Sequence, residues 1–156
     1  MDGKMNPLKP LVTIVTPSFD QARFLEETIR SVLTQDYPHI EYIIIDGGST
    51  DNTLEICQKF KAPLLTCSIE ADNGLYDAMN KGIQAATGEW IIFMNIGDRF
   101  YSCNVLTNMM NTLSIGHSEM LYGDIMKNGR VLSRPPNRLV RKYLFNQALC
   151  HQVILF

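Results

Sequence analysis

This sequence of 156 residues lacks several features that mark common protein classes. Lysine and arginine total 14 against 16 aspartate and glutamate, so no basic excess can neutralise nucleic-acid phosphates, and nucleic acid is excluded as a partner. No apolar run approaches the ~20 residues that cross a bilayer, and residues 1–4 lack the plan of a secretory signal. We therefore expect a cytoplasmic protein.

Paired cysteines and glycine-rich phosphate loops are also missing. The four cysteines form no Cys-x-x-Cys pair, so the sequence predicts neither a zinc knuckle nor a redox dithiol. We expect reduced, mostly buried thiols, because free cysteine behaves as a small hydrophobe. The chain has no Gly-x-Gly-x-x-Gly, which argues against a nicotinamide dehydrogenase, and no glycine-rich basic loop after its first apolar run. A nucleotidyltransferase is therefore kept only as an alternative.

The sequence does contain alternating strand and helix patterns. Its length and its 46% hydrophobic content fit one globular domain. Short apolar runs predict strands at residues 11–16, 42–45, 64–65 and 90–94. Helical spacing joins Leu25, Ile29, Val32 and Leu33, then Leu54 and Ile56, then Leu75, Met79, Ile83 and Ala86. This alternation predicts an α/β fold, with a mostly parallel sheet covered by helices on both faces.

The pattern changes after Asp98. A helix is predicted at residues 105–113, a strand at 120–122 and a hairpin turn at Asn128-Gly129. Positive charge gathers at Arg134, Arg138, Arg141 and Lys142. The chain ends in the strand-like run 152–156, an ending inside a core element that we expect of a truncated chain. Its exposed edge would favour a homo-oligomer.

Polar clusters follow three of the predicted strands, at residues 17–20, 46–51 and 95–98. Ligands of open parallel sheets bind at this carboxyl edge. Carboxylates there can bond to a base or ribose, or hold a divalent cation that bridges to a diphosphate. Simpler explanations also exist: Asp20 as a helix N-cap, one of residues 49–51 as the next cap, and Asn95 with Asp98 as a polar turn. Three clusters on one edge favour a ligand site.

Four ordered motifs resemble the family 2 glycosyltransferases of the GT-A fold. They are VTIVTPSF at residues 12–19, IIDGGSTD at 44–51, EADNGLYDAMNKG at 70–82 and GEWIIFMNIGD at 88–98. A weaker tail follows at 122–124 and 151–152. The most similar subgroup builds bacterial surface polysaccharides. The resemblance implies one Rossmann-like GT-A domain over residues 1–156, with 1–98 as the nucleotide-sugar-binding half and 99–156 as an incomplete start of the acceptor half.

The resemblance implies transfer of a sugar from a nucleoside diphosphate donor, most simply a UDP-sugar. Pro17 and Phe19 are expected near the base, and Asp46 near base or ribose. The family's loop has two adjacent aspartates, but here the second is Gly47, so Asp46 acts alone or with Asp51. The implied acceptor is a glycan or a lipid-linked saccharide, which suggests peripheral association with the inner face of the membrane.

The family's Asp-x-Asp motif matches residues 95–98. Asp98 is then the expected ligand of Mg²⁺ or Mn²⁺, with Asn95 as a further donor contact. On the helix that follows Gly74, Asp77 and Lys81 are candidates to face the donor, although Lys81 also suits a solvated lysine. Tyr76 could stack or pack, and Asp72 or Asn73 could be only a helix cap.

The implied mechanism is inverting, with a carboxylate base that deprotonates the acceptor hydroxyl. The family takes this base from a later part of the domain, so we expect it beyond Phe156. Within the chain, Asp124 is the candidate catalytic residue, because it is the only late carboxylate at a predicted strand end. His151 is either a structural residue or an acceptor contact. The alternatives are a catalytically inactive nucleotide-sugar-binding fragment and a nucleotidyltransferase.

Overall fold

The structure is a computed structural model, which describes residues 9–60, 62–113, 121–122, 124–127, 130–133 and 154–155. Strands and helices alternate through β1 (Val12–Ser18), α1 (Ala22–Leu33), β2 (Ile40–Asp46), α2 (Thr53–Lys59), β3 (Leu65–Ile69), α3 (Leu75–Ala85) and β4 (Trp90–Phe93). They are followed by α4 (Val105–Leu113), β5 (Leu121–Tyr122), β6 (Ile125–Lys127), β7 (Arg130–Ser133) and β8 (Ile154–Leu155). The predicted α/β alternation is confirmed.

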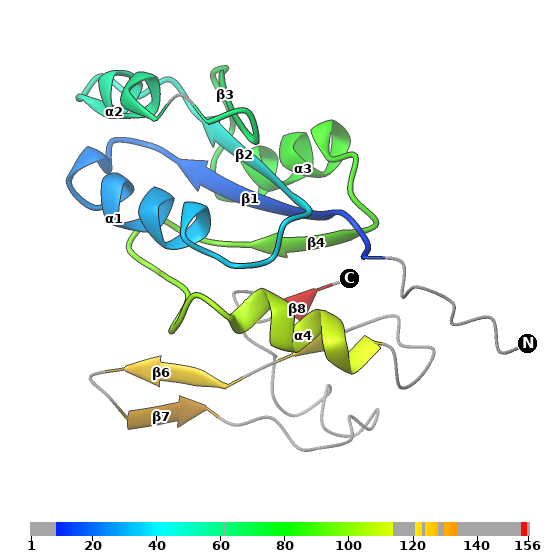
Figure 1. The fold of residues 1–156 in the computed structure, drawn as a ribbon. Coiled ribbons are helices and arrows are strands. Elements are labelled where there is room, and N and C mark those ends of the chain that lie inside the picture. Colours follow the sequence, from blue (N-terminus) through cyan, green and yellow to red (C-terminus); the bar gives the residue numbers. More distant parts are fainter. Residues whose placement is uncertain are drawn as a thin grey trace, which may run out of the picture.

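The main sheet has the strand order β3-β2-β1-β4-β8-β5 (Figure 1). The first four strands run parallel, and β8 pairs antiparallel with β4 and with β5. The strands β6 and β7 form a separate antiparallel pair on either side of the predicted turn at residues 128–129. From β1 the chain adds β2 and β3 on one side of the sheet and then β4 on the other side. Open α/β sheets bind ligands at such a switch point between neighbouring strands.

Helices cover both faces of the sheet, as predicted: α1 and α3 lie on opposite sides (Figure 1). Successive strand side chains point to opposite faces, so each strand supplies both cores. One core lies under α1, α2 and α4 and includes Ile14, Leu25, Ile29, Tyr42, Ile44, Ile92 and Leu106. The other lies under α3 and consists of Val15, Ile43, Ile45, Ala78, Met79 and Phe93.

The buried face of α3 differs from the predicted stripe. Leu75 and Ile83 are 44% and 45% exposed, whereas Ala78, Met79 and Gly82 are buried. A Cβ atom on Gly82 would overlap the side chain of Val15 in β1. The helix therefore approaches the sheet through its small residues, which a count of large apolar side chains does not detect.

The strand β1 extends beyond its predicted end and includes Pro17. The backbone of Val15 faces β4, because its carbonyl accepts the Met94 N–H at 2.9 Å. Pro17 lies two residues after Val15, so its backbone nitrogen also faces β4. That strand has already ended at Phe93, where no partner would need the N–H that proline lacks. Proline thus costs the sheet no hydrogen bond at this position.

Several smaller predictions have mixed outcomes. The weak third strand is real, but it begins at Leu65 and runs to Ile69 as an edge strand whose residues are all half-buried or exposed. Cys57 is buried and Cys67 half-buried, but Cys103 is exposed, so the prediction of burial was wrong for Cys103. Cys150, His151 and the basic residues at 134–142 lie outside the described residues. Within the described helices, none is long and apolar enough to span a membrane.

Candidate functional site

The loops after β1 and β2 are locked together at the carboxyl edge of the sheet. The Gly47 N–H donates to the Ser18 carbonyl at 2.9 Å. The Asp20 N–H donates to Ser49 Oγ at 2.8 Å, and Asp20 Oδ1 accepts the Thr50 N–H at 2.8 Å. Two of the three predicted polar clusters are thus brought into direct contact.

Asp51, rather than Asp20, caps the helix that follows β1. Gln21 is the N-cap residue of α1 and makes no side-chain cap hydrogen bond, so the prediction for Asp20 was wrong. Asp51 Oδ2 accepts the Ala22 N–H at 2.8 Å, and Oδ1 accepts the Thr53 hydroxyl at 2.6 Å. The hydrogen bonds from Thr53 and Ala22 hold the pKa of Asp51 below its ordinary value. One carboxylate therefore joins the starts of α1 and α2.

Asp46 organises its own loop. Its side chain is 1% exposed, with Oδ1 accepting the N–H groups of Gly48 and Ser49 at 3.1 and 2.7 Å. Oδ2 accepts the Ser49 hydroxyl at 2.6 Å. Beside it lies Ser18, its register partner on β1, whose buried hydroxyl has no hydrogen-bond partner among the described residues. A buried hydroxyl without a partner costs free energy, and a bound ligand could supply one.

The loop between β3 and α3 is held by the helix that follows it. Asp77 Oδ2 accepts the Asn73 N–H at 3.0 Å, so Asp77 closes the first turn of α3. Lys81 donates to the Ala71 carbonyl at 2.7 Å and lies 3.5 Å from a Glu70 carboxylate oxygen. Lys81 therefore braces this loop instead of extending freely into solvent. Tyr76 is 76% exposed, so it does not pack into the core.

The loop after β4 is pinned to α1 by one buried hydroxyl. Thr28 Oγ1 accepts the Gly97 N–H at 3.0 Å and donates to the Asp98 carbonyl at 3.0 Å. The Asp98 N–H also donates to the Asn95 carbonyl at 3.1 Å, which closes a turn. Asp98 and Asn95 thus have fixed backbones. Both residues are half-buried at the carboxyl edge, and Asn95 Oδ1 is buried.

The donor set fits a cation held mainly by a substrate. Within the described residues, no three His, Cys, Asp or Glu side chains are grouped as a metal site. Asp98 would then be one protein carboxylate among ligands supplied by a diphosphate, an arrangement that Mg²⁺ accepts. Asp124 lies elsewhere, exposed just before β6.

Prediction from the sequence missed Thr28 and gave Ser18 and Asp72 no specific role at this edge. Thr28 lies inside the apolar pattern of α1 and carries no motif, whereas Ser18 belongs to the predicted polar cluster at residues 17–20. Asp72 was predicted only as a possible cap. Its Oδ1 accepts the Gly74 N–H at 2.8 Å just before α3, but Gly74 is the N-cap residue and the helix has no side-chain cap hydrogen bond. The Asp72 carboxylate also reaches the neighbouring loop, where a Cβ on Gly47 would lie 2.5 Å from Asp72 Oδ2.

Comparison with known proteins identifies relatives of this chain. The profile of the Glycosyl transferase family 2 matches residues 13–152. A PGL/p-HBAD biosynthesis glycosyltransferase of Mycobacterium bovis is 30% identical over 151 residues, which cover 94% of this chain and 59% of that protein. The putative teichuronic acid biosynthesis glycosyltransferase TuaG of Bacillus subtilis is 35% identical over 99 residues, covering 62% of this chain and 39% of that protein.

Solved structures with the same arrangement include glycosyltransferases with bound donors. S. aureus TarS 1–349 in complex with UDP-GlcNAc has a TM-score of 0.73 and 25% identity, covering 80% of this chain and 37% of that chain. The mannosyltransferase PcManGT from Pyrobaculum calidifontis, in complex with GDP-Man and Mn²⁺, has a TM-score of 0.62 and 27% identity, covering 67% and 32%. The chain therefore belongs to the glycosyl transferase family 2 and has the GT-A fold.

Proposed function

We propose that this chain binds a nucleoside diphosphate sugar at the carboxyl edge of its sheet, as part of an enzyme that transfers the sugar with inversion. The observation that carries the proposal is the meeting of the loops after β1 and β2, next to the pinned loop that carries Asp98. The complexes of TarS with UDP-GlcNAc and of PcManGT with GDP-Man and Mn²⁺ support a nucleotide-sugar donor.

The proposed donor lies with its nucleoside over β1 and β2 and its diphosphate at β4. Phe19 is 58% exposed, which suits a ring that stacks on a base, and Pro17 precedes it at the end of β1. The loop organised by Asp46 borders the nucleoside. Asp98 and Asn95 face the diphosphate, where a bound Mg²⁺ or Mn²⁺ would neutralise charge on the departing group. A UDP-sugar is the proposed donor.

The proposed acceptor is a glycan or a lipid-linked saccharide. This is supported by the names of the relatives, which act in PGL/p-HBAD and teichuronic acid biosynthesis. Such an acceptor would bring the protein to the inner face of a bacterial membrane. Inversion requires a base that reaches the acceptor hydroxyl, and the exposed Asp124 is the proposed base among the described residues.

The decisive experiment is calorimetric titration of the protein with UDP, GDP, CDP and dTDP, each with and without Mn²⁺. We expect UDP to bind, and to bind more tightly with the cation, because Asp98 and a diphosphate otherwise repel each other. Absence of binding by all four nucleotides would refute the proposed function. Donor binding without transfer to any acceptor would favour a nucleotide-sugar-binding module.

The role of Asp124 has a separate test. We expect Asp124→Asn to leave UDP affinity unchanged, because Asp124 lies outside the four loops that follow the parallel strands. If Asp124 is the base, transfer of labelled sugar falls about 100-fold or more. Unchanged transfer by this variant would remove Asp124 from the mechanism.

A further inference from the structure

The carboxylates at the carboxyl edge differ in how many hydrogen bonds their oxygens already accept from the protein. Both oxygens of Asp51 accept hydrogen bonds from the starts of α1 and α2. Both oxygens of Asp46 accept hydrogen bonds from its own loop, and Asp46 is 1% exposed. At this low exposure, Asp46 presents almost no surface to a ligand. Neither carboxylate is well suited to receive a nucleoside directly.

Asp72 is in a different situation. Within the described residues it makes one hydrogen bond, from the Gly74 N–H to Oδ1 at 2.8 Å. Its Oδ2 lies against Gly47 on the neighbouring loop, 2.5 Å from the position that a Cβ on Gly47 would occupy. The side chain remains partly exposed. Asp72 thus brings a carboxylate oxygen from the β3–α3 loop to the surface of the β2–α2 loop.

Gly47 provides space rather than backbone freedom. The glycines with positive φ are Gly48, Gly74 and Gly97, and Gly47 is not one of them. An alanine could therefore adopt the backbone angles of Gly47, but its Cβ would collide with Asp72. The resembled family has a second aspartate at this position. In this chain, a carboxylate from the next loop lies where that side chain would begin.

The β3–α3 loop is held in place before any ligand arrives. The Glu70 N–H donates to the Asp46 carbonyl at 2.9 Å, which fixes the start of the loop to β2. Lys81 donates to the Ala71 carbonyl at 2.7 Å and lies 3.5 Å from Glu70 Oε2. These contacts fix the residues on the amino-terminal side of Asp72. A group held in advance loses little entropy when it binds a ligand.

We propose that Asp72 is the acid that recognises the donor's nucleoside, by accepting a hydrogen bond from a base N–H or a ribose hydroxyl. The strand order places β3 and β4 three spacings apart, about 14 Å at the usual separation of neighbouring strands. With its diphosphate near Asp98, the donor would extend across this distance and place its nucleoside next to Asp72. A carboxylate repels phosphate but accepts readily from N–H and O–H groups. This role rests on the proposed function.

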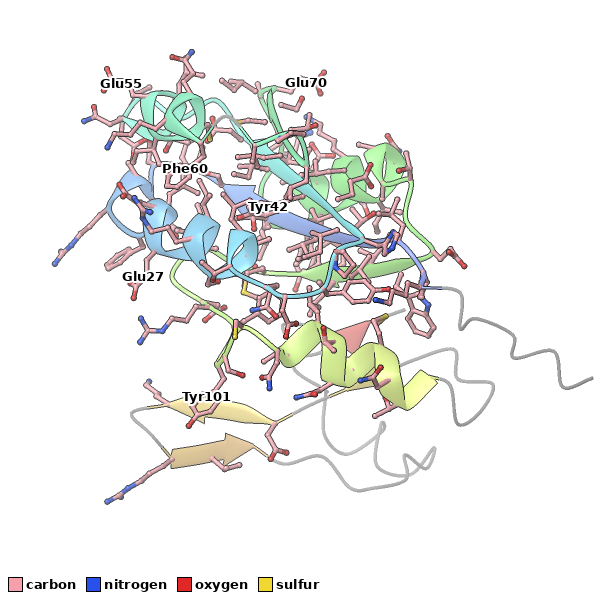
Figure 2. The ribbon with its side chains drawn as sticks, in the orientation of Figure 1. Glu27, Tyr42, Glu55, Phe60, Glu70 and Tyr101 are labelled. Atoms are coloured by element: carbon pink, nitrogen blue, oxygen red, sulfur yellow. The ribbon has the colours of Figure 1, made fainter. Side chains whose placement is uncertain are left out.

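The test compares the binding of uridine, 2′-deoxyuridine and UDP with Mn²⁺ to the wild-type protein and to Asp72→Asn. We expect uridine and UDP to bind Asp72→Asn about 10- to 100-fold more weakly, since a hydrogen bond to a charged acceptor is lost. Glu55→Gln is the matched control, because Glu55 points from α2 away from the sheet (Figure 2). A wild-type preference for uridine over 2′-deoxyuridine that disappears in Asp72→Asn assigns the bond to the ribose, and an equal loss for both nucleosides assigns it to the base.

A second set of variants tests the fit between Asp72 and Gly47. Gly47→Ala should weaken uridine binding in the wild type but have no added effect in Asp72→Ala, because the collision is then gone. Gly47→Asp combined with Asp72→Gly moves the carboxylate to the β2–α2 loop, and we expect it to recover part of the lost affinity.

The outcomes separate this role from the proposed function. If the protein binds UDP but Asp72→Asn binds uridine as tightly as the wild type, the role of Asp72 is refuted and the proposed function stands. Additive effects of Gly47→Ala and Asp72→Ala would also refute it. If none of the nucleotides binds the wild-type protein, the proposed function fails, and the role of Asp72 fails with it.

Discussion

At the scale of single residues, Asp98 is expected to act on the metal-bound diphosphate and not on the fold. Its backbone is held independently of its side chain, by Thr28 and by Asn95. We therefore expect Asp98→Ala to weaken Mn²⁺-dependent UDP binding about 10-fold or more and to leave uridine binding unchanged. Calorimetry with and without Mn²⁺ measures both. Equal losses for UDP and uridine would show that Asp98 supports the loop instead.

Phe19 should contribute through its exposed ring. An aromatic side chain that stacks on a base stabilises binding by about 1–3 kcal/mol, so Phe19→Ala should weaken uridine and UDP alike, by about 10-fold. Tyr101→Ala is the control, since Tyr101 is an exposed aromatic residue on the segment between β4 and α4 (Figure 2). A loss confined to UDP would argue against stacking, because the diphosphate carries no ring.

Residue types of the site could be predicted, but their hydrogen-bond partners could not. Carboxylates after apolar runs indicate a polar edge, and the sequence places Asp46, Asp51 and Asp98 there. Yet Asp20 bonds to Thr50, and Asp51 bonds to Ala22, across 30 and 29 positions. Such pairs depend on how two loops meet in space. Local sequence patterns therefore cannot show which carboxylates already accept hydrogen bonds from other loops.

At the scale of elements, α1 fixes the loop that carries Asp98. Thr28 is fully buried and links this loop to α1 through two hydrogen bonds. Thr28→Val keeps the shape but leaves the Gly97 N–H and the Asp98 carbonyl without that partner, at a cost of about 1–3 kcal/mol in the free energy of unfolding. We also expect weaker Mn²⁺-dependent UDP binding. Chemical denaturation and calorimetry measure the two effects.

The matched control for this prediction is Thr34→Val. Thr34 lies at the end of α1, and its exposed hydroxyl bonds only to carbonyls of the same helix. We expect UDP binding by Thr34→Val to match the wild type. If Thr28→Val lowers stability but binds UDP with Mn²⁺ normally, the α1 link supports the fold without positioning Asp98.

The elements themselves were predictable where burial is strong and less so where it is weak. Central strands such as β2 are apolar on both faces and therefore appear as continuous runs. The edge strand β3 has only half-buried and exposed residues, so only its first apolar residue was detected. The face of α3 was mispredicted because Gly82 and Ala78 give close packing without large side chains.

At the scale of the whole molecule, the two edges of the sheet carry different polar networks. The carboxyl edge holds the candidate site, whereas Glu41, near the start of β2, joins elements at the amino edge. Its carboxylate accepts the Thr13 hydroxyl at 2.6 Å and the Thr87 hydroxyl and N–H at 2.7 and 2.8 Å. These bonds connect β1 and β2 to the loop between α3 and β4. Glu41 therefore contributes to stability at a place remote from the proposed donor.

Glu41 should make the stability of the protein depend on pH in the acidic range. Burial raises the pKa of Glu41, but the hydrogen bonds from Thr13 and Thr87 outweigh burial and hold the pKa below its ordinary value of 4.5. A lowered pKa means that the stabilisation is complete above that value and is lost as the pH falls through the folded-state pKa. We expect Glu41→Gln to lower the free energy of unfolding by about 1 kcal/mol at pH 7, since the side chain is only partly buried.

This difference between Glu41→Gln and the wild type should shrink as the pH falls from 4.5 to below the lowered folded-state pKa of Glu41, because both side chains are uncharged below that pKa. Urea unfolding at several values between about pH 3 and 7 measures it, with the exposed Glu55→Gln as the baseline for general charge effects. UDP affinity at pH 7 should be unchanged, because the amino and carboxyl edges lie at opposite ends of the parallel strands. A difference that stays constant down to pH 3 would mean that packing, and not the carboxylate, accounts for the role of Glu41.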